Sequence, residues 1–111
     1  MVDKEKITLA RKQFQDCSEI FVALGDITRQ KICLDLAESA DEGINVAQLT
    51  GKSLLSRPAI SHHLKVLKNC GLVEPIKKGT QIFYRIRLRD NFAVVRQLIQ
   101  TLDEIFAEEN A

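Results

Sequence analysis

Apolar side chains recur every three or four residues along the first part of the chain, and this spacing predicts two helices. The first helix is expected over residues 3–24, ended by Gly25. Its narrow apolar seam is formed by Ile7, Ala10, Phe14, Cys17, Phe21 and Leu24. Asp26 can cap a second helix over residues 27–39. The positions of that helix expected to face the core are Ile32, Cys33, Leu36 and Ala37.

The next segment, residues 45–71, has the outline of a helix-turn-helix. Asn45 can cap a short helix, because a glutamine three residues later completes a variant of the capping box. Ser56 can cap a longer helix whose first turn holds Pro58, where the missing N–H costs nothing. Gly71 is expected just past the end of this longer helix. A short helix, a turn and a longer capped helix together indicate a helix-turn-helix.

After Gly71 the apolar pattern changes from a helical period to strict alternation, which predicts a β-hairpin over residues 72–89. One strand is expected over residues 72–77 and its partner over residues 81–89, joined by a glycine turn. In the partner strand the apolar side chains that alternate with polar ones are Ile82, Tyr84, Ile86 and Leu88. The outer face is expected to be basic and to carry Arg85, Arg87 and Arg89.

The last helix is expected over residues 90–109, capped by Asp90 or Asn91. It carries one broad apolar stripe formed by Phe92, Val95, Leu98, Ile99, Leu102, Ile105 and Phe106. The 111 residues suit one domain. We therefore predict a mainly α fold with a small β-hairpin over residues 1–111, a winged helix-turn-helix flanked by N- and C-terminal helices.

Charge is strongly segregated along the chain, although the net charge is only +1. Residues 52–89 contain nine basic side chains and a single acidic one, Glu74, for a charge of +8, and the rest of the chain carries −7. A basic surface of this kind suits a polyanion, because each neutralised phosphate releases condensed counterions. Charge alone leaves open whether the basic residues share one face or are scattered over several faces, where they would only keep the domain soluble.

The longer helix of the helix-turn-helix is a candidate recognition helix, the helix that contacts bases in the major groove, and we call it the reading helix. Ile60, Leu64 and Leu67 would form its buried side, and the opposite side carries Arg57, Ser61, His62, Lys65 and Lys68. Such a face can enter a major groove, with Ser61 and His62 near base edges and the longer cations near phosphates. The alternative is an amphipathic surface helix whose basic face is only solvated, and the flanking short helix and basic hairpin favour the reading helix.

The hairpin would act as the wing. Lys77, Lys78 and Thr80 surround a glycine turn, so cationic donors stand at a narrow tip. A tip of this kind can lie along a minor groove or the neighbouring backbone. Alternatively, the charges of a plain hairpin protect its edge strand, and both interpretations can hold for the arginines of the outer face.

The terminal helices expose more apolar surface than one small core can bury, which predicts a homodimer. The expected interface residues are Ile7, Phe14, Cys17, Phe21, Leu98, Leu102 and Ile105. A two-fold dimer places two reading helices about one DNA turn apart, so duplex DNA with an inverted-repeat operator is the expected partner.

Several motifs resemble the ArsR-type (arsenical-resistance-regulator-like) repressors over nearly the whole chain. Residues 23–32, ALGDITRQKI, are similar to the family's entry to the second helix. Residues 61–67, SHHLKVL, then GLV at 71–73, and Gly79 with Phe83 and Tyr84, resemble its reading helix and wing. The resemblance implies a homodimeric winged helix-turn-helix that represses transcription and is released from DNA by a signal. It also implies that Ser61 and His62 read bases, while His63 takes a more structural place.

The signal is not identifiable from the sequence, and neither are the operator and the target genes. Metal-responsive members of that family carry cysteines on the short helix or Asp and His pairs on the last helix, and this chain has neither; no cofactor or metal is expected. The three cysteines are expected to be reduced thiols, with Cys17 and Cys33 as possible redox residues and small apolar core residues as the alternative.

Other classes of function have little support in the sequence. No recognisable catalytic triad or phosphate-binding glycine loop argues for an enzyme. No apolar run approaches the roughly 20 residues that span a bilayer, and a cytoplasmic protein is expected. A winged-helix module that binds proteins and has lost operator binding remains the alternative from another class, against which the basic helix face argues.

Overall fold

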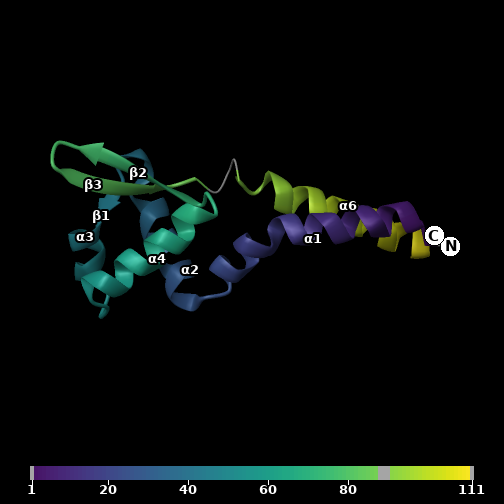
Figure 1. Ribbon diagram of the computed structural model, residues 1–111, viewed down its shortest axis with the longest axis horizontal. Helices are drawn as coiled ribbons and strands as arrows, with labels where there is room; N and C mark the ends of the chain where they lie inside the picture. Colours follow the sequence, from purple (N-terminus) through teal and green to yellow (C-terminus); the bar gives the residue numbers. More distant parts are fainter. Residues whose placement is uncertain (1, 88–90, 111) are drawn as a thin grey trace. The chain divides into compact units, whose positions relative to one another are not determined.

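The computed structural model describes residues 2–87 and 91–110 of the chain. Its helices and strands, labelled in Figure 1, are α1 (Lys4–Leu24), α2 (Ile27–Glu38), β1 (Ile44–Asn45), α3 (Val46–Gly51), α4 (Arg57–Asn69), β2 (Val73–Lys78), β3 (Gln81–Ile86) and α6 (Ala93–Asn110). The chain divides into two compact units. One comprises the described residues within Met1–Glu19 and Arg89–Ala111, and the other comprises those within Ile20–Leu88. The prediction of a mainly α fold with a small β element is confirmed.

The first unit is built from most of α1 packed against α6. Asp3 begins α1, because its carboxylate accepts the backbone N–H of Glu5 at 2.9 Å. Four buried side chains form the core of this unit, Ala10, Cys17, Leu98 and Ile105. Partly buried apolar side chains pack around them, namely Ile7, Val94, Val95 and Leu102. An ion pair between Lys6 and Glu104, with 3.8 Å between Nζ and Oε2, joins the same two helices.

This packing changes the expected interface between two chains. Cys17, Leu98 and Ile105 were expected to face a second chain, but each is at most 5% exposed within a single chain. The expectation is wrong for these three, because α1 and α6 of one chain already cover them. Large apolar side chains of the unit that remain about half exposed are Leu9, Phe14, Ile99 and Phe106.

In the second unit, capping residues start the helices where the sequence predicts. The side chain of Asp26 accepts the backbone N–H of Arg29 at 3.0 Å and starts α2. Asn45 and Gln48 form a complete capping box at the start of α3. The buried residues of α2 are Ile32, Cys33 and Leu36. Ala37, which was expected among them, is exposed, because it lies outside the face that the other three define.

The sheet has three strands in the order β1-β3-β2, all antiparallel, so the wing is more than a hairpin. The extra strand, β1, pairs Ile44 with Tyr84 and Asn45 with Phe83. Gly43 precedes it with φ of 77° and ψ of 175°, and a Cβ there would stand 2.9 Å from the carbonyl oxygen of Tyr84. The chain can approach β3 this closely because the residue is glycine.

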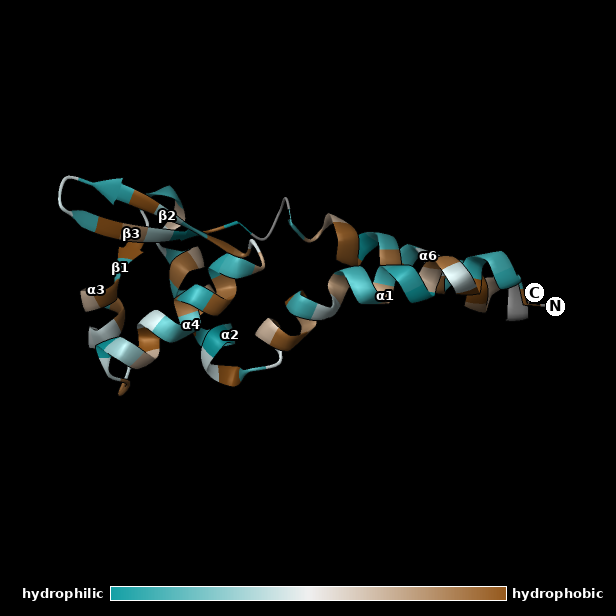
Figure 2. Cartoon of the chain, in the orientation of Figure 1, coloured by the Kyte–Doolittle hydropathy of each residue, from teal (hydrophilic) through white to brown (hydrophobic). Residues whose placement is uncertain are grey.

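The β2–β3 hairpin is confirmed, with two differences from the expected pattern. The described part of β3 ends at Ile86, and the expectations that fall on Leu88, Arg89 and Asp90 lie outside the described residues. Ile82, expected on the inward side of the alternation, is 49% exposed. The hydropathy colours of Figure 2 show mixed apolar and polar positions along both strands of the wing.

Candidate nucleic-acid interface

The reading helix α4 has one buried and one exposed side. The side chain of Ser56 accepts the backbone N–H of Ala59 at 3.3 Å, and Pro58 stands in the first turn. Three leucine and isoleucine side chains that are at most 1% exposed anchor the helix to the core, Ile60, Leu64 and Leu67. The helix ends before Gly71, whose φ of 76° is the left-handed conformation expected after a helix C-terminus.

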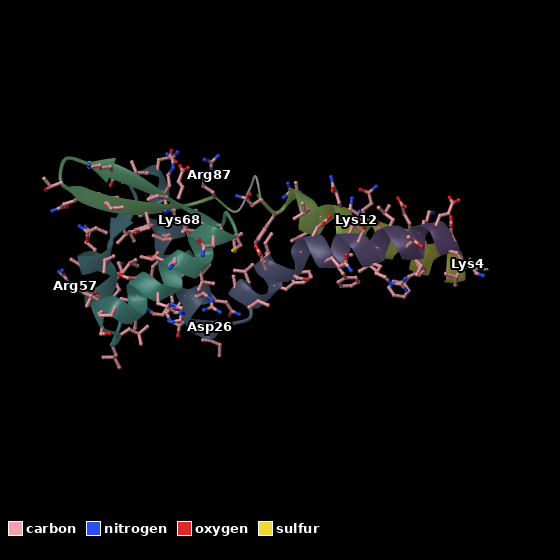
Figure 3. The ribbon with its side chains drawn as sticks, viewed as in Figure 1. Lys4, Lys12, Asp26, Arg57, Lys68 and Arg87 are labelled. Carbon is pink, nitrogen blue, oxygen red and sulfur yellow. The ribbon has the colours of Figure 1, made fainter. Side chains whose placement is uncertain are left out.

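All five predicted reading-face residues of α4 are exposed, namely Arg57, Ser61, His62, Lys65 and Lys68. Arg57 and Lys68, labelled in Figure 3, belong to the first and last turns of the helix. The face therefore carries cations at both ends, and between them Ser61, His62 and a further cation, Lys65. Charged and short polar groups in this arrangement can meet phosphates and base edges respectively.

A pocket of about 390 Å³ brings the start of α4 next to the wing. It is lined by Asn45, Val46, Ala47, Arg57, Thr80, Gln81, Ile82 and Tyr84. Arg57 and Thr80, both predicted to contact DNA, therefore belong to the same concave surface. Sequence reasoning did not find Asn45, Gln81 or Ile82 as neighbours of this surface, because they meet only through the pairing of β1 with β3.

The basic side chains of the wing differ in how far the fold itself engages them. Glu74 forms ion pairs with both Arg85 and Arg87. Their hydrogen bonds, first that of Arg87, hold the pKa of the Glu74 carboxyl below its ordinary value. Lys77 and Lys78 are both exposed, and Lys78 also donates a hydrogen bond to the backbone carbonyl of Glu42. Arg85 and Arg87 thus stabilise the hairpin, in line with the structural interpretation of their charge.

Four of the predicted phosphate-binding cations are available at the surface. Arg57, Lys65, Lys68 and Lys77 are all exposed, and none of them makes an ion pair within residues 2–87 and 91–110. A cation without an acidic partner keeps its full charge for a polyanion, which makes these four the strongest candidates for phosphate contacts.

The cysteines are all free thiols. Burial raises the pKa of Cys17, and the charge of Asp16 adds to the effect. Burial raises the pKa of Cys33 to about 11, with a further contribution from Cys70. Because the thiolate is the reactive form, these shifts disfavour the redox role considered for Cys17 and Cys33.

Among the described residues, no group of three His, Cys, Asp or Glu side chains could hold a metal ion. No helix of the described residues is long and apolar enough to cross a membrane.

Known proteins with similar sequences are regulators that carry a helix-turn-helix, as this geometry does. Residues 28–75 match the family model described as bacterial regulatory protein, arsR family. An uncharacterized HTH-type transcriptional regulator of Methanocaldococcus jannaschii is 36% identical over 94 residues, which cover 85% of the chain and 99% of that protein. The chain belongs to the ArsR family. It is thus a transcriptional regulator with a DNA-binding winged helix, and its family is one of transcriptional regulators.

Other relatives of this ArsR-family regulator are also named as transcriptional regulators or repressors. The cadmium resistance transcriptional regulatory protein CadC homolog of Staphylococcus aureus is 33% identical, over 77% of the chain and 69% of that protein. The transcriptional repressor SdpR of Bacillus subtilis is 35% identical, over 62% of the chain and 73% of that protein. Among solved structures, an ArsR-like transcriptional regulator from Rhodococcus sp. RHA1 superposes with a TM-score of 0.67 at 32% identity, covering 87% of this chain and 83% of that one.

Proposed function

We propose that this ArsR-family regulator binds an inverted-repeat operator in duplex DNA as a homodimer and represses transcription until a signal releases it. The proposal has two halves, DNA binding and homodimer formation. The DNA-binding half rests on the exposed polar face of α4, whose Arg57 lines the same pocket as Thr80 of the wing. Ser61 and His62 would read bases, while Arg57, Lys65, Lys68 and Lys77 would contact phosphates. Lys78 and Thr80 would guide the wing along the neighbouring backbone. The cytoplasm is the compartment that such a function implies.

The homodimer half is supported by the apolar surface that the first unit leaves uncovered. A groove of about 270 Å³ on this unit is lined by Ile7, Ala10, Arg11, Phe14 and Leu102. Phe14, which lines this groove, is 47% exposed. An exposed apolar groove is typical of surfaces that bind a protein partner. A second copy of the same helices is the partner we propose, with Ile7, Phe14 and Leu102 at its centre and Phe21 as a further contact.

Selection of bound sequences from random duplex DNA tests the first half. We expect one inverted-repeat sequence to be enriched and its affinity to fall steeply as the salt concentration rises. A protein that binds every duplex equally, or binds none, would contradict the proposed function.

Replacement of Phe14 by Glu tests the second half, because a charge in the groove cannot be desolvated cheaply. Sedimentation should then report a monomer at concentrations where the wild type is a dimer, with weaker operator binding. Leu34→Glu, a similar change at a residue of α2 that is 67% exposed in the other unit, is the matched control and should leave the dimer intact. A wild-type protein that is monomeric at micromolar concentration would overturn this half.

A further inference from the structure

The side chain of Arg29 joins three elements of the second unit. Its backbone N–H donates to the side chain of Asp26, the residue that caps α2. Its guanidinium points back to the end of α1, where Nε donates to the carbonyl oxygen of Ala23 at 2.7 Å and Nη2 to that of Val22 at 3.3 Å. Its Nη1 lies 3.2 Å from Nδ1 of His63 on α4. A single side chain therefore connects the end of α1, the start of α2 and the reading helix.

This contact assigns the donor and the acceptor between the two side chains. A guanidinium has only donors, so Nη1 of Arg29 donates and Nδ1 of His63 accepts. The charged and titratable groups that the described residues place around His63 are Arg29, the carboxylate of Asp26 and the ring of His62, whose centroid is 5.9 Å away.

We propose that Arg29 and His63 are positioning residues, which set the rotation of α4 so that Ser61 and His62 can read bases. The buried side of the helix is held by apolar contacts, which are not directional. The hydrogen bond between Arg29 and His63, the residue beside His62, is directional and can therefore fix the rotation of α4 about its axis. Side-chain tips stand about 5–6 Å from a helix axis. A rotation of about 20° thus moves them by about 2 Å, beyond the tolerance of a hydrogen bond.

This inference rests on the proposed function, and two variants of His63 separate a positioning role from a merely structural one. His63→Asn places an oxygen where Nδ1 stands and keeps an acceptor for Arg29, whereas His63→Ala removes it. Both variants are compared with the wild type for unfolding in urea and for Kd on the selected operator and on a random duplex.

We expect His63→Ala to weaken operator binding by about tenfold or more, the scale of one lost base contact, while random-duplex binding changes little. His63→Asn should recover most of the operator affinity. Equal losses for the two variants, or equal losses on operator and random duplex, would overturn the inference. Failure of the wild type to prefer any sequence would instead overturn the proposed function itself.

Discussion

The side-chain nitrogen of Lys78 donates a hydrogen bond of 2.7 Å to the backbone oxygen of Glu42. The same ammonium lies 4.7 Å from the centre of the Phe83 ring. Lys78 thus joins the wing to the 3-10 helix Ala40–Glu42 that precedes β1, and part of its donor capacity is already used within the fold. Lys77, its neighbour in sequence, is exposed and makes no ion pair with any other described residue.

Replacing these two lysines by alanine should therefore give different results. Lys77→Ala should weaken binding to all duplexes and lower the slope of log affinity against log salt by about one phosphate contact. Lys78→Ala should chiefly lower the free energy of unfolding, by about 1 kcal/mol, through loss of the carbonyl and ring contacts. Salt titrations of DNA affinity and urea unfolding of both variants check this; a larger salt effect for Lys78→Ala than for Lys77→Ala would contradict it.

On α4, charge and base reading should separate in the same way. Lys65→Glu replaces an exposed cation by an anion, so we expect weaker binding to operator and random duplex alike. His62→Ala should mainly relax sequence preference, with operator affinity falling and random-duplex affinity almost unchanged. Competition binding on a panel of single-base operator variants measures both effects. If neither variant alters DNA affinity, α4 is not the reading helix.

Two glycines offer a matched pair for the stability of the segment around β1. Gly43→Ala meets both the close Tyr84 carbonyl and a positive φ, which should cost about 1–3 kcal/mol of unfolding free energy. Gly51→Ala lies in α3 with open space around the new Cβ, and should stabilise the protein by about 0.5–1 kcal/mol through higher helix propensity. Urea denaturation of the two variants suffices, and a tolerated Gly43→Ala would mean that β1 does not need its close approach to β3.

Acidification should loosen the wing through Glu74. Its pKa is lowered in the folded protein, so its contribution to stability is present above the ordinary glutamate pKa. That contribution is lost as the pH falls through the lower, folded value. Glu74→Gln should therefore be less stable than the wild type at pH 7, and the difference should shrink toward pH 3. Unfolding curves at both pH values measure it, and a constant difference would show that the ion pairs with Arg85 and Arg87 contribute nothing.

Much of the fold is readable from the sequence because capping is local. Asn45 with Gln48, and Ser56 with Pro58, fix the starts of α3 and α4 through atoms only three residues apart. The exposed face of α4 follows equally from its period. The residues that meet DNA in our proposal could thus be named before the structure, apart from the pocket residues that β1 brings in.

What the sequence could not provide depends on contacts between distant segments. A strand of two residues has no alternation to recognise, so β1 was missed. An apolar stripe indicates that a helix face is covered but not by what, and therefore Cys17, Leu98 and Ile105 were assigned to a second chain. The contact between Arg29 and His63 spans 34 residues, and nothing in the local pattern around either residue points to it.

The short strand β1 has a consequence for how regulators of this design can diversify. Asn45 at once caps α3, pairs with Phe83 and donates to Gln81 of the wing at 3.3 Å. The base of the wing is thereby anchored, whereas nothing lies within 4 Å of a Cβ atom added at Gly79 in its tip. Insertions at the tip could lengthen its reach along the groove and leave base preference, set elsewhere, untouched.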